Sequence, residues 1–390
     1  MTKIIIFVIF ALFFLYFIKI VSKVIKTRML YWLPPYVVQG YRRIKRQPVG
    51  NPRHIMLCFV DHYEPFNGNV NLEKAIQRVE AWKIGYPQMA NKFVDADGKH
   101  PQHTWFYPPH LDHRFLEDLV NLCKQGYGEV EMHLHHNHMD PFPDTSETLK
   151  DKIRQCIKDY GKYGIFCLPD GRKAFAFIHG DWSLDNSGGA KLCGVNNEIK
   201  ILKEMGCFAD FTFPSINQCQ PRMVNTLYYC KDDPSRPKSY DKGIEVKIGL
   251  PPKDVDLLMV TGPIGLRLKK WRFRIPVPAI ESDALEIIPP KPERIDFWID
   301  RKIRVKGQDN WIFTKVHTHG AAEYNHDLNL GVGAQGMYDY LLQKYNDGRE
   351  FILHFVTARE MYNIIKAAEA GCSGNPNDYR DYLIPKYVYK

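Results

Sequence analysis

The feature that most constrains the fold of this chain is an alternation of short apolar, β-rich segments with segments of helical period. The apolar segments are "HIMLCFV", "HTWFYPP", "EVEMHLHH", "AFAFIHG", "FADFTFP", "WIFTKVHTHG" and "FILHFVT". Helical period lies between several of them, over residues 72–93, 114–124, 147–160 and 197–205. Strands that alternate with helices pair in parallel, because each helix returns the chain to the same end of the sheet. The sequence therefore predicts an α/β fold, either a barrel or a doubly wound sheet.

The alternation sets the expected domain bounds. It begins near residue 54 and ends near residue 371, where Thr357 and Glu360 fit a capping box and Gly371 fits the position after a helix. Helical period is lost over residues 221–310, which we expect to form an irregular β-rich insertion. Residues 372–390 form the expected C-terminal tail.

The N-terminal segment differs from the rest of the chain. "IIIFVIFALFFLYFI", continued by Ile20 and Val21, is long enough to span a bilayer, and no small-residue cleavage site follows it. We expect residues 1–22 to form a single membrane anchor and residues 23–53 to form a basic juxtamembrane segment. Basic residues after the span outweigh the one before it, which predicts a cytoplasmic body.

The distribution of charge excludes one class of partner. The net charge is +9, and ten basic residues precede the first acidic one, Asp61. The rest of the chain is therefore close to neutral, whereas a nucleic-acid binder carries its basic residues on the folded domain. A basic segment beside an apolar one instead predicts contact with a membrane surface. The nine cysteines show no disulfide-framework spacing, which fits reduced thiols.

The segment "EVEMHLHHNH", residues 129–138, carries four histidines in six positions. Strand alternation places His133 and His135 on one face, where they could chelate one metal ion. His136 and His138 fall in the following turn. Histidine is the commonest protein metal ligand, and three nitrogen or oxygen ligands with an open position describe a catalytic zinc site. The competing interpretation is that these imidazoles are solvated or bind backbone groups.

Other polar residues also fall at or just past the C-terminal ends of predicted strands, the edge that carries the active site in parallel α/β folds. They are Asp61, His135, His179, Asp181, His317 and His319. In "CFVDHYEPF", Asp61 and His62 offer one group for a metal and one for proton transfer, while Glu64 could be a metal ligand or could only cap or pair locally. In "FIHGDW", His179, Asp181 and Trp182 suit sugar binding, because Trp stacks on a pyranose. Their competing interpretation is a polar turn.

Taken together, these motifs resemble the NodB-homology polysaccharide deacetylases. "FVDH" resembles the first motif of the family and implies Asp61 as base and His62 as metal ligand. "GEVEMH" resembles the second and implies His133 as a ligand, but the family's second histidine falls on Asn137. His135, His138 or His179 is left to complete the metal site. "FIHGDW" replaces the third motif, and "DFTFPS" resembles the fourth. "VHTHG" resembles the last, which implies His319 or His317 as general acid.

The resemblance implies a distorted (β/α) barrel with a divalent metal, zinc above all, at its C-terminal rim. The expected reaction is metal-dependent deacetylation of a membrane-associated polysaccharide or a lipid-linked saccharide. Two other hypotheses stay open. One is a metal-dependent glycosidase that uses Asp61 with Asp181 or Asp210, since glycosidases need two carboxylates. The other is an anchored, non-catalytic glycan-binding or assembly protein. The sequence does not indicate an oligomeric state.

Overall fold

The computed structural model describes residues 2–44, 50, 52–138, 141–249, 251–270 and 276–390. Its centre is a ten-stranded sheet in the order β11-β1-β2-β3-β4-β5-β8-β6-β7, with β12 also paired to β1. In this order, each strand from β11 to β8 is parallel to its neighbour. β6 is antiparallel to β8, and β7 is antiparallel to β6. The sheet strands are β1 (Arg53–His62), β2 (His103–Tyr107), β3 (Gly128–Leu134), β4 (Phe175–His179), β5 (Cys207–Asp210), β6 (Leu227–Cys230), β7 (Ile244–Glu245), β8 (Leu257–Val260), β11 (Trp311–Thr318) and β12 (Phe351–Val356).

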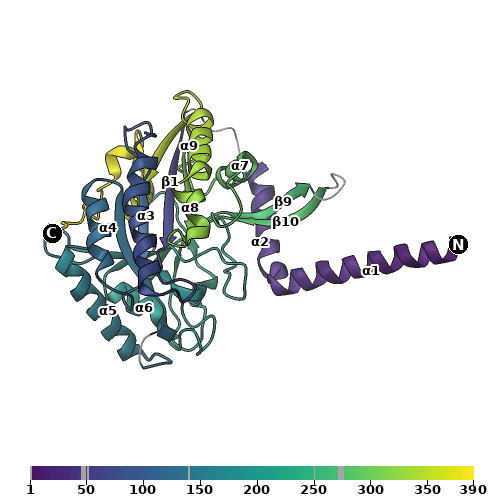
Figure 1. Cartoon of the computed structure of the whole chain (residues 1–390), viewed down its shortest axis with the longest axis horizontal. Helices are drawn as coiled ribbons and strands as arrows, with labels where there is room; N and C mark the ends of the chain where they lie inside the picture. Colours follow the sequence, from purple (N-terminus) through teal and green to yellow (C-terminus); the bar gives the residue numbers. More distant parts are fainter. Residues whose placement is uncertain (1, 45–49, 51, 139–140, 250, 271–275) are drawn as a thin grey trace.

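Helices connect the strands and cover the outer side of the sheet (Figure 1). They are α3 (Leu72–Ala90), α4 (Phe115–Lys124), α5 (Ser146–Tyr160), α6 (Glu198–Glu204), α7 (Pro292–Asp300), α8 (His326–Asn329), α9 (Val332–Tyr345) and α10 (Ala358–Glu369). Every residue of β2, β3, β4 and β11 is buried, as expected for parallel strands covered on both faces, and this includes the polar residues Glu129, Glu131 and His133 of β3. The predicted α/β architecture is confirmed. The capping box of Thr357 and Glu360 is also confirmed.

The register of the sheet decides which side chains share a face. Val60 pairs with His317, His62 pairs with Phe106, and Phe106 pairs with Glu131. Directly paired residues of neighbouring strands project from the same face, and successive residues project from opposite faces. His62, His133 and His317 therefore share one face of the sheet, and Asp61 lies on the other.

The face that carries His62 is the concave one. Lys315, on β11 and of the same parity as His317, donates hydrogen bonds to the carbonyls of Phe211 and Phe213, at 3.0 and 2.7 Å, just after β5. A side chain can cross from β11 to β5 only if the sheet curves around it. Within the described part of the chain, no strand pair joins β11 to β8, so the Lys315 side chain spans this gap in the strand order.

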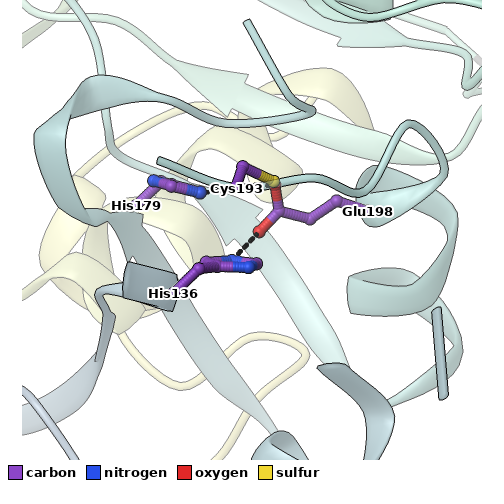
Figure 2. Close-up of side chains that lie close together, drawn as sticks. All are labelled: His136, His179, Cys193 and Glu198. Atoms are coloured by element: carbon purple, nitrogen blue, oxygen red, sulfur yellow. Dashed lines mark hydrogen bonds and ion pairs between the residues drawn. The ribbon is translucent and has the colours of Figure 1, made fainter. Parts of the chain in front are cut away.

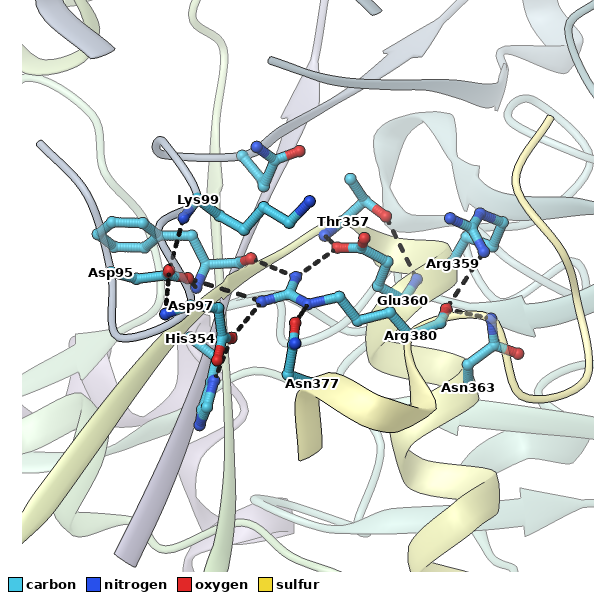
Figure 3. Close-up of polar contacts among 12 residues, drawn as sticks. Asp95, Asp97, Lys99, His354, Thr357, Arg359, Glu360, Asn363, Asn377 and Arg380 are labelled. Atoms are coloured by element: carbon cyan, nitrogen blue, oxygen red, sulfur yellow. Dashed lines mark hydrogen bonds and ion pairs between the residues drawn. The ribbon is translucent and has the colours of Figure 1, made fainter. Parts of the chain in front are cut away.

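Polar contacts fix the C-terminal tail to β12, to α10 and to the loop that carries Asp97 (Figure 3). Arg380 donates to the Phe355 carbonyl at 2.7 Å and pairs with Asp97 at 2.8 Å and with Glu360 at 2.9 Å. Arg359 is buried and donates to the carbonyl of Ile384 at 2.6 Å. These bonds satisfy buried backbone groups that the tail would otherwise leave without partners.

Residues 221–310 contain β6, β7, β8, α7 and a hairpin of β9 (Ile264–Lys270) and β10 (Pro276–Ser282). Part of the basic–aromatic stretch "RLKKWRFRIPVP", residues 271–275, lies outside the described residues. The hairpin lies beside the helix α2 (Met29–Ile44), whose buried Trp32 packs with Val224 and Ile264. The part of the expected juxtamembrane segment that forms α2 is thus docked on this part of the body.

The expected membrane anchor falls within the helix α1 (Thr2–Lys26), which projects away from the body (Figure 1). Among the residues described, none of the helices combines the length and the apolar character needed to cross a membrane.

Candidate metal and catalytic site

Three side chains converge at the C-terminal edge of the concave face. Glu64 follows β1, His133 is near the end of β3, and His135 follows it. The His135 Nε2 lies 2.8 Å from Glu64 Oε1 and 3.0 Å from the His133 Nε2, and the His133 Nε2 lies 3.7 Å from the same carboxylate oxygen. One ligand atom from each residue lies within 4.8 Å of the others. Two imidazole nitrogens and a carboxylate directed at one point fit a catalytic zinc site, which leaves a coordination position open.

Neighbouring groups hold these imidazoles in the orientation that metal binding requires. The Nδ1–H of His133 donates to the Ile178 carbonyl at 3.0 Å, which leaves Nε2 as the free lone pair. The Nδ1 of His135 faces the Asp181 carboxylate at 3.4 Å. Metal-bound histidines almost always have such a carbonyl or carboxylate partner on the second nitrogen. Asp181 thus faces the second nitrogen of the candidate ligand His135. The sequence had instead predicted that Asp181 binds sugar.

The pKa values within this group reflect its charge balance. Burial raises the pKa of Glu64, but hydrogen bonds and charges from His133 and His135 outweigh it and hold the pKa well below its usual range. Burial lowers the pKa of His133. Burial also lowers the pKa of His135, but Asp181 and Glu64 outweigh it and raise the pKa to about 9. The carboxylate is therefore ionised and available as a ligand at neutral pH, whereas a metal ion would have to displace the second proton of His135 before that ring could bind it.

Three further imidazoles face this group. His62 lies between them, with its ring centroid 4.8 Å from that of His133, 4.7 Å from that of His319 and 5.9 Å from that of His317. Burial and the surrounding imidazoles hold the pKa of His62 well below its usual value, so its ring is neutral. His62 was expected to be a metal ligand. The structure places Glu64 with His133 and His135 instead, and His62 beside them.

Each of the two remaining imidazoles is bound to a carboxylate. The Nδ1–H of His317 donates to Asp283 at 2.7 Å, and the Nδ1–H of His319 donates to Glu286. Burial lowers the pKa of His319, but Glu286 outweighs it and raises the pKa above its usual value. A carboxylate on Nδ1 fixes the tautomer and leaves Nε2 for proton transfer, as in catalytic triads.

Asp61, the expected base, is not brought together with these groups. It projects from the outer face, is completely buried, and accepts hydrogen bonds from the His103 Nε2 at 2.9 Å and the Gly320 amide at 2.8 Å. A β-carbon on Gly320 would lie 2.4 Å from the Asp61 carboxylate, so the chain passes too closely for any other residue there. Through these hydrogen bonds, Asp61 connects β1 with β2 and with the turn after β11.

A second group of candidate ligands gathers around His179, which the pairing of β3 with β4 places on the outer face of the sheet (Figure 2 shows the group). His136, His179, Cys193 and Glu198 are all completely or almost completely buried, and each offers a ligand atom within 4.8 Å of the others. This group could hold a metal ion. Leu134 pairs with His179 and His133 pairs with Ile178, so His179 projects away from the rim. It was expected to contact substrate, and its burial here leaves no route to it from the concave face.

Trp182 is half-buried at the edge of the concave face. Its ring centroid lies 5.7 Å from that of His62 and 6.2 Å from those of His317 and His319. Its indole N–H is shielded from solvent and has no acceptor among the described residues. Trp182 therefore forms a wall beside the three imidazoles, with a donor free for a bound ligand.

No protein-family model matches the sequence, and no curated protein matches it. The solved structures that are similar to this one include the following two. The first is a provisionally assigned polysaccharide deacetylase from Mycobacterium smegmatis, with 11% identity, a TM-score of 0.44, and coverage of 88% of this chain and 96% of that one. The second is a provisionally assigned glycoside hydrolase/deacetylase from Parabacteroides distasonis, with 10% identity, a TM-score of 0.40, and coverage of 85% and 74%.

Proposed function

We propose that the protein is a metal-dependent hydrolase that removes an N-acyl group, such as acetyl, from a saccharide. The observation that carries this proposal is the convergence of Glu64, His133 and His135 on one point beside two carboxylate-bound imidazoles, His317 and His319. A divalent ion held by the first three residues would supply Lewis acidity toward a carbonyl oxygen and toward water. Amide hydrolysis also needs a base and an acid, and the two imidazoles can supply them.

The two imidazole–carboxylate pairs divide the proton transfers. The Nε2 of His317, whose other nitrogen is bound to Asp283, takes the proton of the attacking water. The oxygen of that water bonds to the acyl carbon, and the carbon–nitrogen bond breaks. His319, whose raised pKa favours the protonated form, gives its Nε2 proton to the departing amine. Asp61 was expected as base, but it lies on the other face of the sheet, so this proposal transfers that role to His317.

The position of Trp182 supports the proposal that the acyl group is carried by a saccharide. An indole face packs against a sugar ring, and its N–H can donate to a hydroxyl. The glycosidase hypothesis needed Asp61 with Asp181 or Asp210. Asp61 lies on the outer face, and Asp210 is buried and accepts from Thr212 at 2.6 Å. Neither Asp61 with Asp181 nor Asp61 with Asp210 can therefore place two carboxylates at one glycosidic bond.

The proposal includes a substrate at a membrane surface, either lipid-linked or polymeric, and a cytoplasmic body. The support is the row of exposed apolar side chains on α1, including Phe7, Phe10, Phe14 and Phe17, together with the basic segment that follows it. Exposed apolar surface of this extent marks an interaction site.

The test is to assay the purified, zinc-loaded full chain on N-acetylated oligosaccharides for released acetate and for new reducing ends. We expect acetate without reducing ends. His319→Gln should retain zinc and lower kcat by about 10²- to 10⁴-fold, the usual contribution of a general acid. New reducing ends without acetate would replace this proposal with a glycosidase. Saccharide binding with neither product would indicate a non-catalytic protein.

A further inference from the structure

The buried cluster of His136, His179, Cys193 and Glu198 is assembled from four separate places in the chain. His136 is in the turn after β3, His179 ends β4, Cys193 lies in the following loop, and Glu198 begins α6 (Figure 2). The His136 Nε2 lies 3.0 Å from Glu198 Oε1, the His179 Nε2 lies 3.6 Å from Glu198 Oε2, and the Cys193 Sγ lies 3.5 Å from the same oxygen. A tetrahedral ion with bonds of about 2.0–2.3 Å spaces its ligand atoms by about 3.3–3.8 Å.

Two nitrogens in this cluster have no hydrogen-bond partner among the described residues, the Nδ1 of His136 and the Nε2 of His179, and the second has no carboxylate closer than 3.6 Å. The Nδ1–H of His179 donates to the Gly180 carbonyl, so its Nε2 is a bare lone pair. That Nε2 is completely buried, accepts no hydrogen bond from the described residues, and is directed at Glu198. Buried polar atoms without partners are rare in folded proteins and indicate an unseen water or ion.

We infer that this cluster is a second, structural metal site, separate from the rim site, that holds a zinc-class ion on His136, His179, Cys193 and Glu198. Four protein ligands and complete burial leave no position for water or substrate, which distinguishes a structural zinc site from a catalytic one. The thiolate makes this site softer than the rim site, which offers only imidazole and carboxylate.

The alternative is a hydrogen-bonded network without an ion. The His136 Nδ1 lies 2.8 Å from Asp144, although the two are not aligned for a hydrogen bond, and its Nε2 is bound to Glu198, so a protonated His136 would bridge two carboxylates. That network accounts for the carboxylates around His136, but it leaves the buried Nε2 lone pair of His179 without a hydrogen-bond donor. With an ion present, Asp144 becomes the carboxylate partner of the second nitrogen of His136.

A metal ion at this site would order the loop that carries Asp181 and Trp182, two residues beside the rim site. Residues 180–197 lie between the ligands His179 and Glu198, include the ligand Cys193, and carry Asp181 and Trp182, both with positive φ of 55°. Such backbone conformations are costly for residues other than glycine and persist only where surrounding contacts hold them. An ion bound before and after this loop would supply such contacts.

The experiment uses the full chain, stripped of metal and reconstituted with Co²⁺. Wild type should bind two equivalents and show a thiolate-to-cobalt charge-transfer band in the near ultraviolet. Glu64→Gln should lose one equivalent and keep the band, and Cys193→Ser should lose one equivalent and the band. Cys156→Ser, which changes a buried thiol on α5, is the matched control and should keep both.

The measurement on wild type can overturn the inference even if Cys193→Ser does not fold. A wild-type protein that takes up cobalt without the thiolate band would overturn the inference and leave the network of hydrogen bonds. A band that persists in folded Cys193→Ser would overturn it as well. These outcomes do not depend on acetate release, so the failure of this inference and the failure of the proposed activity are separate results.

Discussion

Glu64 and His62 lie two residues apart, and the structure assigns them different roles that metal affinity can distinguish. We predict that Glu64→Gln weakens zinc binding at the rim strongly and that His62→Gln weakens it little. Glu64 places a carboxylate oxygen 2.8 Å from the His135 Nε2 and 3.7 Å from the His133 Nε2, so it is one of three candidate ligands. His62 contacts the ring of His133 at its edge and belongs to neither candidate group.

The magnitude follows from the number of ligands. Loss of an outer-sphere partner usually costs 10- to 100-fold in metal affinity, or about 1.4–2.7 kcal/mol. Loss of one ligand out of three should exceed that range, so we expect Glu64→Gln to lower zinc affinity by more than about 100-fold. His62→Gln removes neither a ligand nor a partner of one, and we expect a change below about tenfold, or 1.4 kcal/mol.

The assay is competition with a chromophoric chelator of known affinity, at fixed pH and ionic strength, on each variant and on wild type. Circular dichroism confirms that both variants are folded. A loss above 100-fold in His62→Gln, with Glu64→Gln near wild type, would refute the arrangement. That result would restore His62 as the ligand implied by the sequence motif.

Three further outcomes are expected. Asp181→Asn should lower zinc affinity at the rim by about 10- to 100-fold, since it replaces the carboxylate that faces a ligand's second nitrogen; an unchanged affinity would remove Asp181 from that role. Arg359→Met should lower the free energy of unfolding by about 3–5 kcal/mol in urea titrations, because it leaves a buried carboxylate unpaired. Burial raises the pKa of Asp97, but His354 and Arg380 outweigh it and lower the pKa to about 2, so Asp97 stabilises the fold above its unfolded pKa and loses this contribution as pH falls toward 2. The stability deficit of Asp97→Asn should therefore shrink between pH 4 and pH 2, and a constant deficit would contradict this.

The sequence was sufficient to predict the α/β architecture, because its β-rich segments alternate along the chain with segments of helical period. The capping box at Thr357 and Glu360 was equally readable, since its two hydrogen bonds are local. The same local reasoning predicted that Asp61 lies at a strand end, but it could not predict which face of the sheet the side chain projects from. Which of Asp61 and His62 faces the rim depends on the register with β2 and β11, and register is a property of the assembled sheet.

The partners of the histidines were beyond prediction for a different reason. Glu198 is 62 positions from His136, and Glu286 is 33 positions from His319. No periodicity connects residues at such separations, and Asp283 and Glu286 lie in the region whose helical period is lost. The structure brings them to the site because residues 283–285 run beside β11, where the amide of Leu285 donates to the carbonyl of His317 at 2.7 Å. A carboxylate within an irregular segment carries no sign of its role in the sequence.

The histidine run itself shows how one short segment can serve two sites. Alternation along β3 directs His133 to the concave face, and His135 continues that direction past the end of the strand, where both meet Glu64. The next residue, His136, starts a turn and lies on the other side of the sheet with His179. Consecutive histidines at a strand end therefore separate rather than combine. Four imidazoles in six positions suggested a single dense ligand set, but the structure divides them: His133 and His135 join the site at the rim, His136 joins the closed group, and the exposed His138 lies beside His135, with ring centroids 5.1 Å apart.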